Sequence, residues 1–164
     1  MSRSNTPVTI AALVLAAWLG TSLFFSAIVA PAAFRALPDV SMAGALVRAT
    51  LPAVFYWGMI AGLIALWLGG TSAADRGRLA RNLCSAGVVV CCAVGQFVAV
   101  QRIDRLSARL AAPIESLAPT DPSRLTFDRL HSLSVGALGV AMLLALASIV
   151  LLWRAGLAST VSRE

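Results

Sequence analysis

Four long apolar stretches divide this chain, and almost every charged residue falls between them. The stretches cover approximately residues 8–30, 51–70, 83–100 and 133–153. Each is close to the ~20 residues that a helix needs to cross the hydrocarbon core of a bilayer. The chain is only 12% charged, which is about half the charged share of a soluble domain. These features predict an all-α integral membrane protein whose four spanning helices form a four-helix bundle.

Capping residues and prolines set the bounds of the predicted helices. Thr6-Pro7 and Asp121-Pro122 are typical helix starts, and Asp39 or Ser41 is expected to cap the second helix. We predict one domain, 1–164, containing two helical hairpins, with helices at about 7–30, 41–69, 78–110 and 122–154. The second, third and fourth helices are then longer than their apolar cores, so we expect them to extend beyond the bilayer on one side.

Prolines interrupt the pattern at two further places. Pro31 and Pro38 bracket residues 32–37, which we predict to be the connection between the first two helices. Pro52 lies inside the second helix, where we expect a kink.

The net charge of +6 comes from arginine alone, because the chain contains no lysine. This excludes Schiff-base chemistry and a lysine general base. The arginines lie between apolar stretches, a pattern typical of contacts with lipid headgroups rather than with nucleic acid. On the side of the two termini they are packed into shorter segments with fewer acids. We therefore predict an inner-membrane protein with both termini in the cytoplasm.

Two features have alternative interpretations. The first apolar stretch is longer than the 7–15 residues of a usual signal-peptide core, and we expect it to be a retained helix. Cys84, Cys91 and Cys92 all lie in the third stretch, which favours small buried hydrophobes over a disulfide framework. Palmitoylation of Cys84 is an alternative.

The single histidine, His131, lies at the start of the fourth apolar stretch. Asp128 is three residues before it and Ser134 three residues after it, so we expect all three on one side of the helix. A carboxylate one turn away can orient an imidazole ring. We interpret this group either as an interfacial hydrogen-bonded histidine or as a ligand site. Haem or another metal would need a further ligand, from a methionine or a second subunit.

Three other residues are candidate ligand-binding positions. Gln96 lies within the third helix, where an amide needs a partner, and we expect a hydrogen bond across the bundle to a serine or threonine. Trp18 lies inside the first span, so we predict that it faces inward. Arg35 is expected near the His131 group on the outer side. There it would join either a charged network or a solvated surface, with the other members Arg48, Asp104, Asp128 and Arg129.

Small residues recur at helical spacing. Gly58 and Gly62 form a GxxxG pair in the second helix, and Gly87, Cys91 and Gly95 follow one face of the third. Such patterns favour close helix approach within the bundle or between two copies of the chain. The sequence contains no phosphate-binding loop, nucleophile elbow, HExxH or CxxC motif. This inventory favours a non-enzymatic protein.

Two short motifs resemble those of a known family. Trp18-Leu19-Gly20-Thr21, Phe24-Phe25 and Ala30-Pro31 with Phe34 resemble its first-helix signature, and Phe127-xx-Leu130-His131-xx-Ser134 resembles its fourth-helix signature. The family is the transmembrane protein 205-like group, domain of unknown function 4149. Its members often carry an asparagine a few residues after that serine, where this chain reads Val135-Gly136-Ala137-Leu138. The resemblance implies an architecture similar to copper-resistance-D-type four-helix membrane proteins.

Three functional hypotheses follow. The first is a non-enzymatic inner-membrane protein that binds or helps to move a small molecule or lipid, or scaffolds a partner. The second is a haem- or metal-binding redox protein that uses His131. The third is a structural subunit of a membrane assembly. We expect membrane lipids as partners, with a second copy or another membrane protein as alternatives, and we predict no resident cofactor and no nucleic acid.

Overall fold

The computed structural model describes residues 6–70, 77–110 and 113–161, and these residues form helices and no strand. The first rod contains α1 (Thr6–Phe24), the π-helical turn η1 (Phe25–Val29) and α2 (Ala30–Ala36). The second rod is α3 (Val40–Gly70). The third contains α4 (Arg78–Ala93), the π-helical segment η2 (Val94–Val100) and α5 (Gln101–Ser107). The 3-10 turn η3 (Ile114–Ser116) precedes α6 (Pro122–Val161), the fourth rod.

All four rods are long and apolar enough to cross a membrane. The candidate spans contain between 30 and 33 described residues each, about ten more than the ~20 that the hydrocarbon core requires. The prediction of an all-α membrane protein with four spanning helices is confirmed. The extra length is not confined to the last three helices, since the first span also reaches 31 residues.

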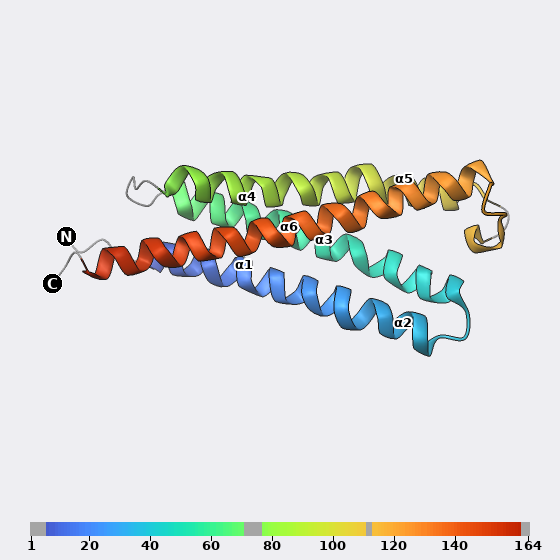
Figure 1. Cartoon of the computed structure of the whole chain (residues 1–164), viewed down its shortest axis with the longest axis horizontal. Coiled ribbons are helices and arrows are strands. Elements are labelled where there is room, and N and C mark those ends of the chain that lie inside the picture. The colour runs from blue at the N-terminus through green and yellow to red at the C-terminus, as the bar shows by residue number, and fades with distance from the viewer. Residues whose placement is uncertain (1–5, 71–76, 111–112, 162–164) are drawn as a thin grey trace.

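The rods run up and down the long axis of the molecule (Figure 1). The start of α1, the end of α3, the start of α4 and the last turns of α6 lie at one end, which we call the termini end. The opposite end, the loop end, carries the α2–α3 link and η3. Around the bundle α1 packs on α3, α3 on α4, α4 on α6, and α6 on α1. Each rod therefore has two principal neighbours.

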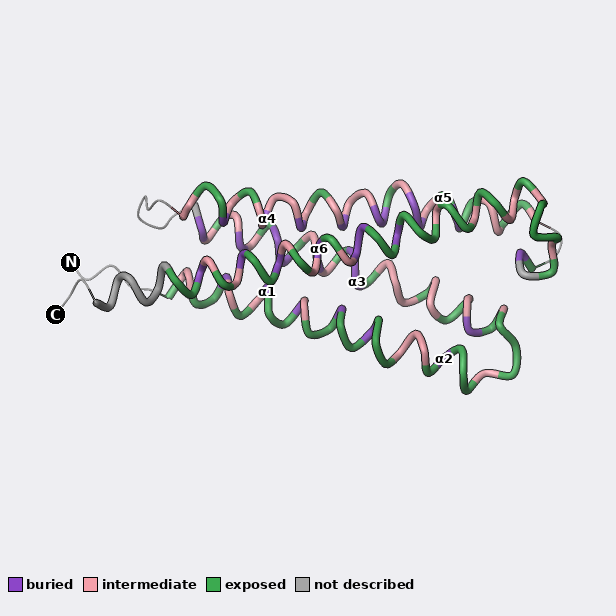
Figure 2. Tube along the Cα trace, in the orientation of Figure 1, coloured by how far each residue is buried: buried purple, intermediate pink, exposed green. Residues whose placement is uncertain are grey.

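The core is a narrow strip along the bundle axis, shown by the buried segments in Figure 2. Its largest fully buried apolar side chains are Trp18, Phe55, Leu15 and Leu152. Most other core residues are small, alanine above all. Small residues let helix backbones approach closely. In a bilayer this close packing drives helix association, because the hydrophobic effect does not act between helices that are surrounded by lipid.

The first rod differs from its prediction after residue 30. The predicted connection at 32–37 is wrong, because α2 continues the helix through Pro31 to Ala36 and only Leu37–Asp39 link it to α3. Pro31 lies at the start of α2, directly after η1. The π-helical turn shifts the backbone pairing by one residue at the point where the proline ring offers no N–H. The helix therefore tolerates a residue that reads as a stop in the sequence.

The remaining bounds lie closer to their predictions. The helices predicted to start at 78 and 122 do so, while the third rod ends at Ser107 and α6 extends to Val161. α3 runs without interruption through Pro52.

The rods diverge at the loop end. In Figure 1 the rod containing α1 and α2 separates from α6 as both approach the right-hand side of the view. α2 keeps its main interhelical contacts with α3. The bundle is therefore tight at the termini end and wider at the loop end.

Candidate functional site

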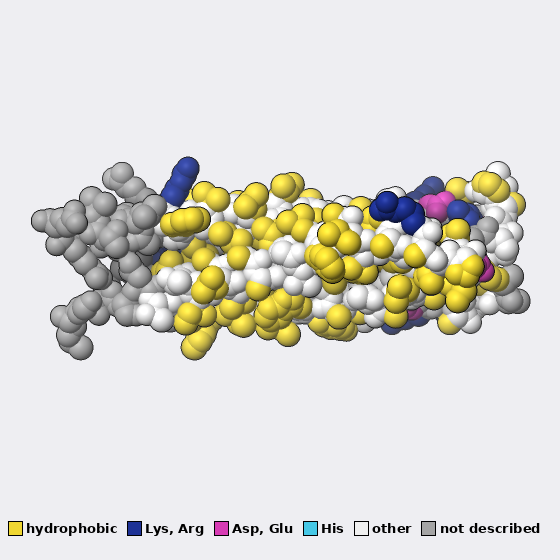
Figure 3. Space-filling model, turned by 90° about the horizontal axis from the view of Figure 1, so that it is seen from below, with side chains coloured by type: hydrophobic (Ala, Val, Ile, Leu, Met, Phe, Trp, Pro, Cys, Tyr) yellow, Lys and Arg dark blue, Asp and Glu magenta, His cyan; other side chains and the backbone are white. Residues whose placement is uncertain are grey.

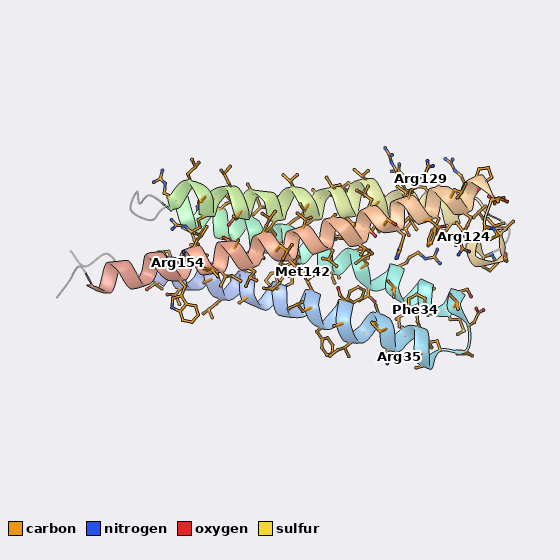
Figure 4. All side chains as sticks on the ribbon, in the orientation of Figure 1. Phe34, Arg35, Arg124, Arg129, Met142 and Arg154 are labelled. Atoms are coloured by element: carbon orange, nitrogen blue, oxygen red, sulfur yellow. The ribbon has the colours of Figure 1, made fainter. Side chains whose placement is uncertain are left out.

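The loop end carries most of the charged side chains in the described part of the chain. Figure 3 shows hydrophobic side chains along most of the molecule, with arginine and aspartate gathered toward the loop end. In Figure 4 Phe34 and Arg35 on α2, and Arg124 and Arg129 on α6, lie at this end, and Arg154 lies at the other. The charged residues thus leave a long apolar belt between two polar ends, as a bilayer requires.

The predicted His131 group is not assembled. The His131 ring is exposed and stacks on Phe127, one turn earlier, with ring centroids 5.9 Å apart. Asp128 instead pairs with Arg124, at 3.5 Å from Nε to Oδ1. Ser134 is buried, and its hydroxyl donates to the carbonyl of His131 at 2.8 Å. Ser134 therefore faces the bundle while His131 and Asp128 face outward, so the prediction of one shared helix side is wrong.

Trp18 occupies the predicted inward position. Its side chain is fully buried, and its indole Nε1 donates to the carbonyl of Val54 on α3 at 2.9 Å. It packs against Gly58, where a Cβ would lie 2.7 Å from the indole ring and 2.5 Å from Cys92 Sγ. Trp18 therefore fastens α1 to α3 at a point where the GxxxG pair permits close approach.

Gln96 is buried in η2, with 4% of its surface exposed. Its side-chain Oε1 has no hydrogen-bond partner among the described residues. Among the serines and threonines expected as partners, Thr21 donates to the carbonyl of Ala17 and Ser22 to that of Trp18, each within its own helix. The predicted hydrogen bond across the bundle to Gln96 Oε1 is therefore absent, and a buried amide oxygen without a donor is costly.

Arg35 lines a shallow open pocket on η1 and α2. The pocket is lined by small and apolar side chains together with this one arginine: Ala27, Ile28, Ala32, Arg35 and Ala36. The Arg35 Nε donates to the carbonyl of Pro31 at 3.2 Å, within the same helix. The pocket therefore combines an apolar floor with one guanidinium.

The Arg48 side chain links α3 to α5 at the loop end. It is partly buried on α3, and its Nη1 donates to the hydroxyl of Ser107 on α5 at 2.8 Å. No carboxylate of residues 6–70, 77–110 and 113–161 forms an ion pair with it, and the one ion pair that we find there is Arg124–Asp128. Of the two alternatives for Arg35, Arg48, Asp104, Asp128 and Arg129, a charged network or a solvated surface, the network is not formed among the described residues.

A polar cluster at the termini end was not predicted. Arg81 is only 1% exposed, although its sequence position suggests a headgroup contact. One turn later on α4, the buried hydroxyl of Ser85 is 2.9 Å from that of Ser148 on α6. The spacing of Arg81, Ser85, Val88 and Cys92 along one helical stripe is the sequence signal that identifies this face.

No metal-binding cluster is present among the residues that the structure describes. Groups of three or more histidine, cysteine, aspartate or glutamate side chains do not occur there. Of the three cysteines, Cys92 is buried against Gly58, and Cys84 and Cys91 are half-buried.

Residues 13–112 match the family described as a domain of unknown function, DUF4149. The chain belongs to the DUF4149 family. The match covers most of the first rod and all of the second and third, including Trp18, Arg48 and Gln96, whereas the His131 segment on α6 lies outside it. No curated protein and no solved structure matches the chain.

Proposed function

We propose that this DUF4149 protein binds an anionic membrane lipid at the loop end, as a non-enzymatic lipid-binding or lipid-moving protein. The observation that carries this proposal is Arg48. Its guanidinium is partly buried between α3 and α5 and is bonded to a neutral hydroxyl of Ser107. A cation withdrawn from water is stable only with a compensating anion or with several hydrogen bonds. A lipid phosphate supplies both.

The surroundings of Arg48 suit an amphipathic ligand. Apolar side chains are exposed on the same segment of α3 and on α2, among them Val40, Met42, Leu46 and Phe34. The pocket on α2 adds apolar side chains beside the Arg35 guanidinium. Acyl chains along these surfaces and a phosphate at the arginines would satisfy both kinds of contact.

The test compares two lipids and two variants of the full-length protein. In neutral detergent, native mass spectrometry should show tighter binding of phosphatidylglycerol than of phosphatidylcholine. Arg48→Gln should weaken phosphatidylglycerol binding about tenfold, because a charge-assisted hydrogen bond contributes about 1.5–3 kcal/mol and tenfold corresponds to about 1.4 kcal/mol.

Arg129→Gln is the matched control. Arg129 also lies at the loop end, on α6, but its side chain is exposed. This variant should bind phosphatidylglycerol like the wild type. Circular dichroism of both variants verifies that the helices are intact. Equal binding of the two lipids, or equal losses in the two variants, would overturn the proposal.

A haem or metal site has less support. The exposed His131 ring stacks on Phe127, so a second ligand would have to come from outside this bundle. The visible absorption spectrum of the purified protein tests this alternative. A Soret band that disappears in His131→Ala would favour it over lipid binding.

The proposal also includes the wider family relationship of the chain and the membrane in which it lies. The first-helix motif around Trp18 supports a place within the transmembrane protein 205-like group, and the four-rod architecture is compatible with the wider copper-resistance-D-like set. Fold likeness alone is a weak guide to function, so no copper chemistry is assigned. The arginine distribution supports the bacterial-type inner membrane with cytoplasmic termini.

A further inference from the structure

Contacts between the rods fix which residues lie at the same depth. The hydrogen bond from Trp18 to Val54 shows that these residues of α1 and α3 lie at the same depth. The packing of Phe55 on Gly95 does the same for α3 and η2. The hydroxyl pair Ser85–Ser148 sets α4 against α6. Because α6 runs antiparallel to α4, Gln96 lies level with about Ala137, each being eleven residues from its serine.

Two of the four rods contain a π-helical segment at or close to this depth. η1 begins at Phe25, two turns beyond Trp18. Pro52 lies two residues from Val54, and η2 contains Gln96 itself. We call this depth the Gln96 layer, formed by Trp18, residues 52–55 of α3, η2 and residues 134–138 of α6. π-helical turns cost stability and are frequent at functional sites.

Three side-chain donors close to Gln96 are already committed within the protein. Trp18 Nε1 donates to Val54, the Ser22 hydroxyl to Trp18, and the Ser134 hydroxyl to His131. Pro52 has no N–H to offer the carbonyl of Arg48. Gln96 Oε1 is buried and has no partner in the described chain.

The missing group is a neutral donor. The Gln96 layer contains no charged side chain, and a cation at this depth would bear a large desolvation cost. We infer that the Gln96 layer binds a hydroxyl group that donates a hydrogen bond to Gln96 Oε1, supplied by water or by an uncharged long-chain alcohol. This site is separate from the Arg48 site and differs from it in ligand charge.

Glutamine-selective isotope labelling makes the site directly observable. The chain contains two glutamines, Gln96 and Gln101, so Gln101→Met leaves the Gln96 side chain as the single labelled amide. Full-length Gln101→Met is placed in phosphatidylcholine vesicles and measured by water-edited solid-state NMR. If water occupies the site, magnetisation should transfer from water to the Gln96 amide. Absence of transfer indicates that water does not occupy the site.

Hexadecanol and its methyl ether then distinguish the two hydroxyl sources. If the alcohol occupies the site, hexadecanol abolishes any magnetisation transfer from water. It also raises the thermal unfolding temperature of the wild type and of Gln101→Met, because a ligand stabilises the state that it binds. The unfolding temperature of Gln96→Met should not change. The methyl ether, which lacks the donor, has neither effect. Water transfer that hexadecanol leaves intact supports the site with water as its occupant.

No water transfer together with no hexadecanol-specific stabilisation overturns the inference. The Arg48 proposal is tested independently, because Gln96→Met should retain wild-type affinity for phosphatidylglycerol. Loss of phosphatidylglycerol binding in Arg48→Gln with an unchanged Gln96 signal would likewise leave the Gln96 site standing.

Discussion

Asp39 shows how one carboxylate organises the link between α2 and α3. Its Oδ1 accepts from the backbone N–H of Ser41 at 3.0 Å, and its Oδ2 accepts from the Ser41 hydroxyl at 2.8 Å. The Asp39 carbonyl also accepts from the N–H groups of Met42 and Ala43. Of the two predicted caps, Asp39 is the one that holds the start of α3.

The same contacts predict the titration of Asp39. The backbone hydrogen bond from Ser41, followed by the hydroxyl bond, holds the pKa of this exposed carboxyl below its ordinary value. A depressed pKa means that the stabilising contribution is present at neutral pH and is lost as the pH falls through the folded-state pKa, below about pH 4. NMR titration of the Asp39 carboxyl should give this lowered pKa, and Ser41→Ala should raise it toward the ordinary value. An unchanged pKa in Ser41→Ala would mean that Ser41 does not set it.

At the scale of elements, the GxxxG pair on α3 determines how closely the rods pack. A Cβ on Gly58 would meet Cys92 Sγ at 2.5 Å and the Trp18 ring at 2.7 Å. One on Gly62 would lie 2.7 Å from a Val89 methyl and 3.1 Å from the carbonyl of Ser85. The predicted close approach through this pair is confirmed within the bundle, between α3 and its two neighbours.

Gly58→Ala should therefore destabilise the protein by about 1–3 kcal/mol, the usual cost of overpacking a filled core. Gly20→Ala on α1 is the control, since a Cβ there meets nothing within 4 Å. That variant should be neutral or stabilising by up to about 1 kcal/mol, through helix propensity. Unfolding of both variants by sodium dodecyl sulfate in mixed micelles measures the difference. Equal stabilities would show that the rods can separate at Gly58 without cost.

The elements also show what the sequence could and could not predict. Span length and capping predicted the four helices, because bilayer thickness and helix-end chemistry act locally on the chain. The π-helical turns were not foreseen, since their residues are as apolar as those around them. The helix end predicted before Pro31 was wrong because η1 accommodates the proline.

The candidate site was harder to predict than the helices. One-turn spacing favoured a pair between Asp128 and His131, but Arg124 lies one turn from Asp128 on the other side and forms the ion pair. Trp18 was placed correctly because an indole within a span needs a partner. Arg81 was not, because an arginine near a helix end reads as a headgroup contact whether or not its side chain is buried.

At the scale of the whole molecule, the two ends differ in charge. In the sequence, the two terminal segments and the link between the second and third helices contain six arginines and two acids, and the remaining segments contain seven arginines and five acids. The net charges, +4 and +2, sum to the +6 of the chain. The first group of arginines also lies in shorter segments of the sequence, and the cytoplasmic orientation that we propose for the termini rests on this difference.

Cysteine labelling tests this orientation in a background with Cys84, Cys91 and Cys92 replaced by alanine. Ala118→Cys places a thiol at an exposed position of the loop end, and Arg154→Cys places one at an exposed position of the termini end. A membrane-impermeant maleimide added to intact spheroplasts should label the first variant, and should label the second only after the membrane is permeabilised. The reverse pattern would place the loop end, and with it Arg48, on the cytoplasmic side. The lipid bound at Arg48 would then come from the inner leaflet rather than the outer one.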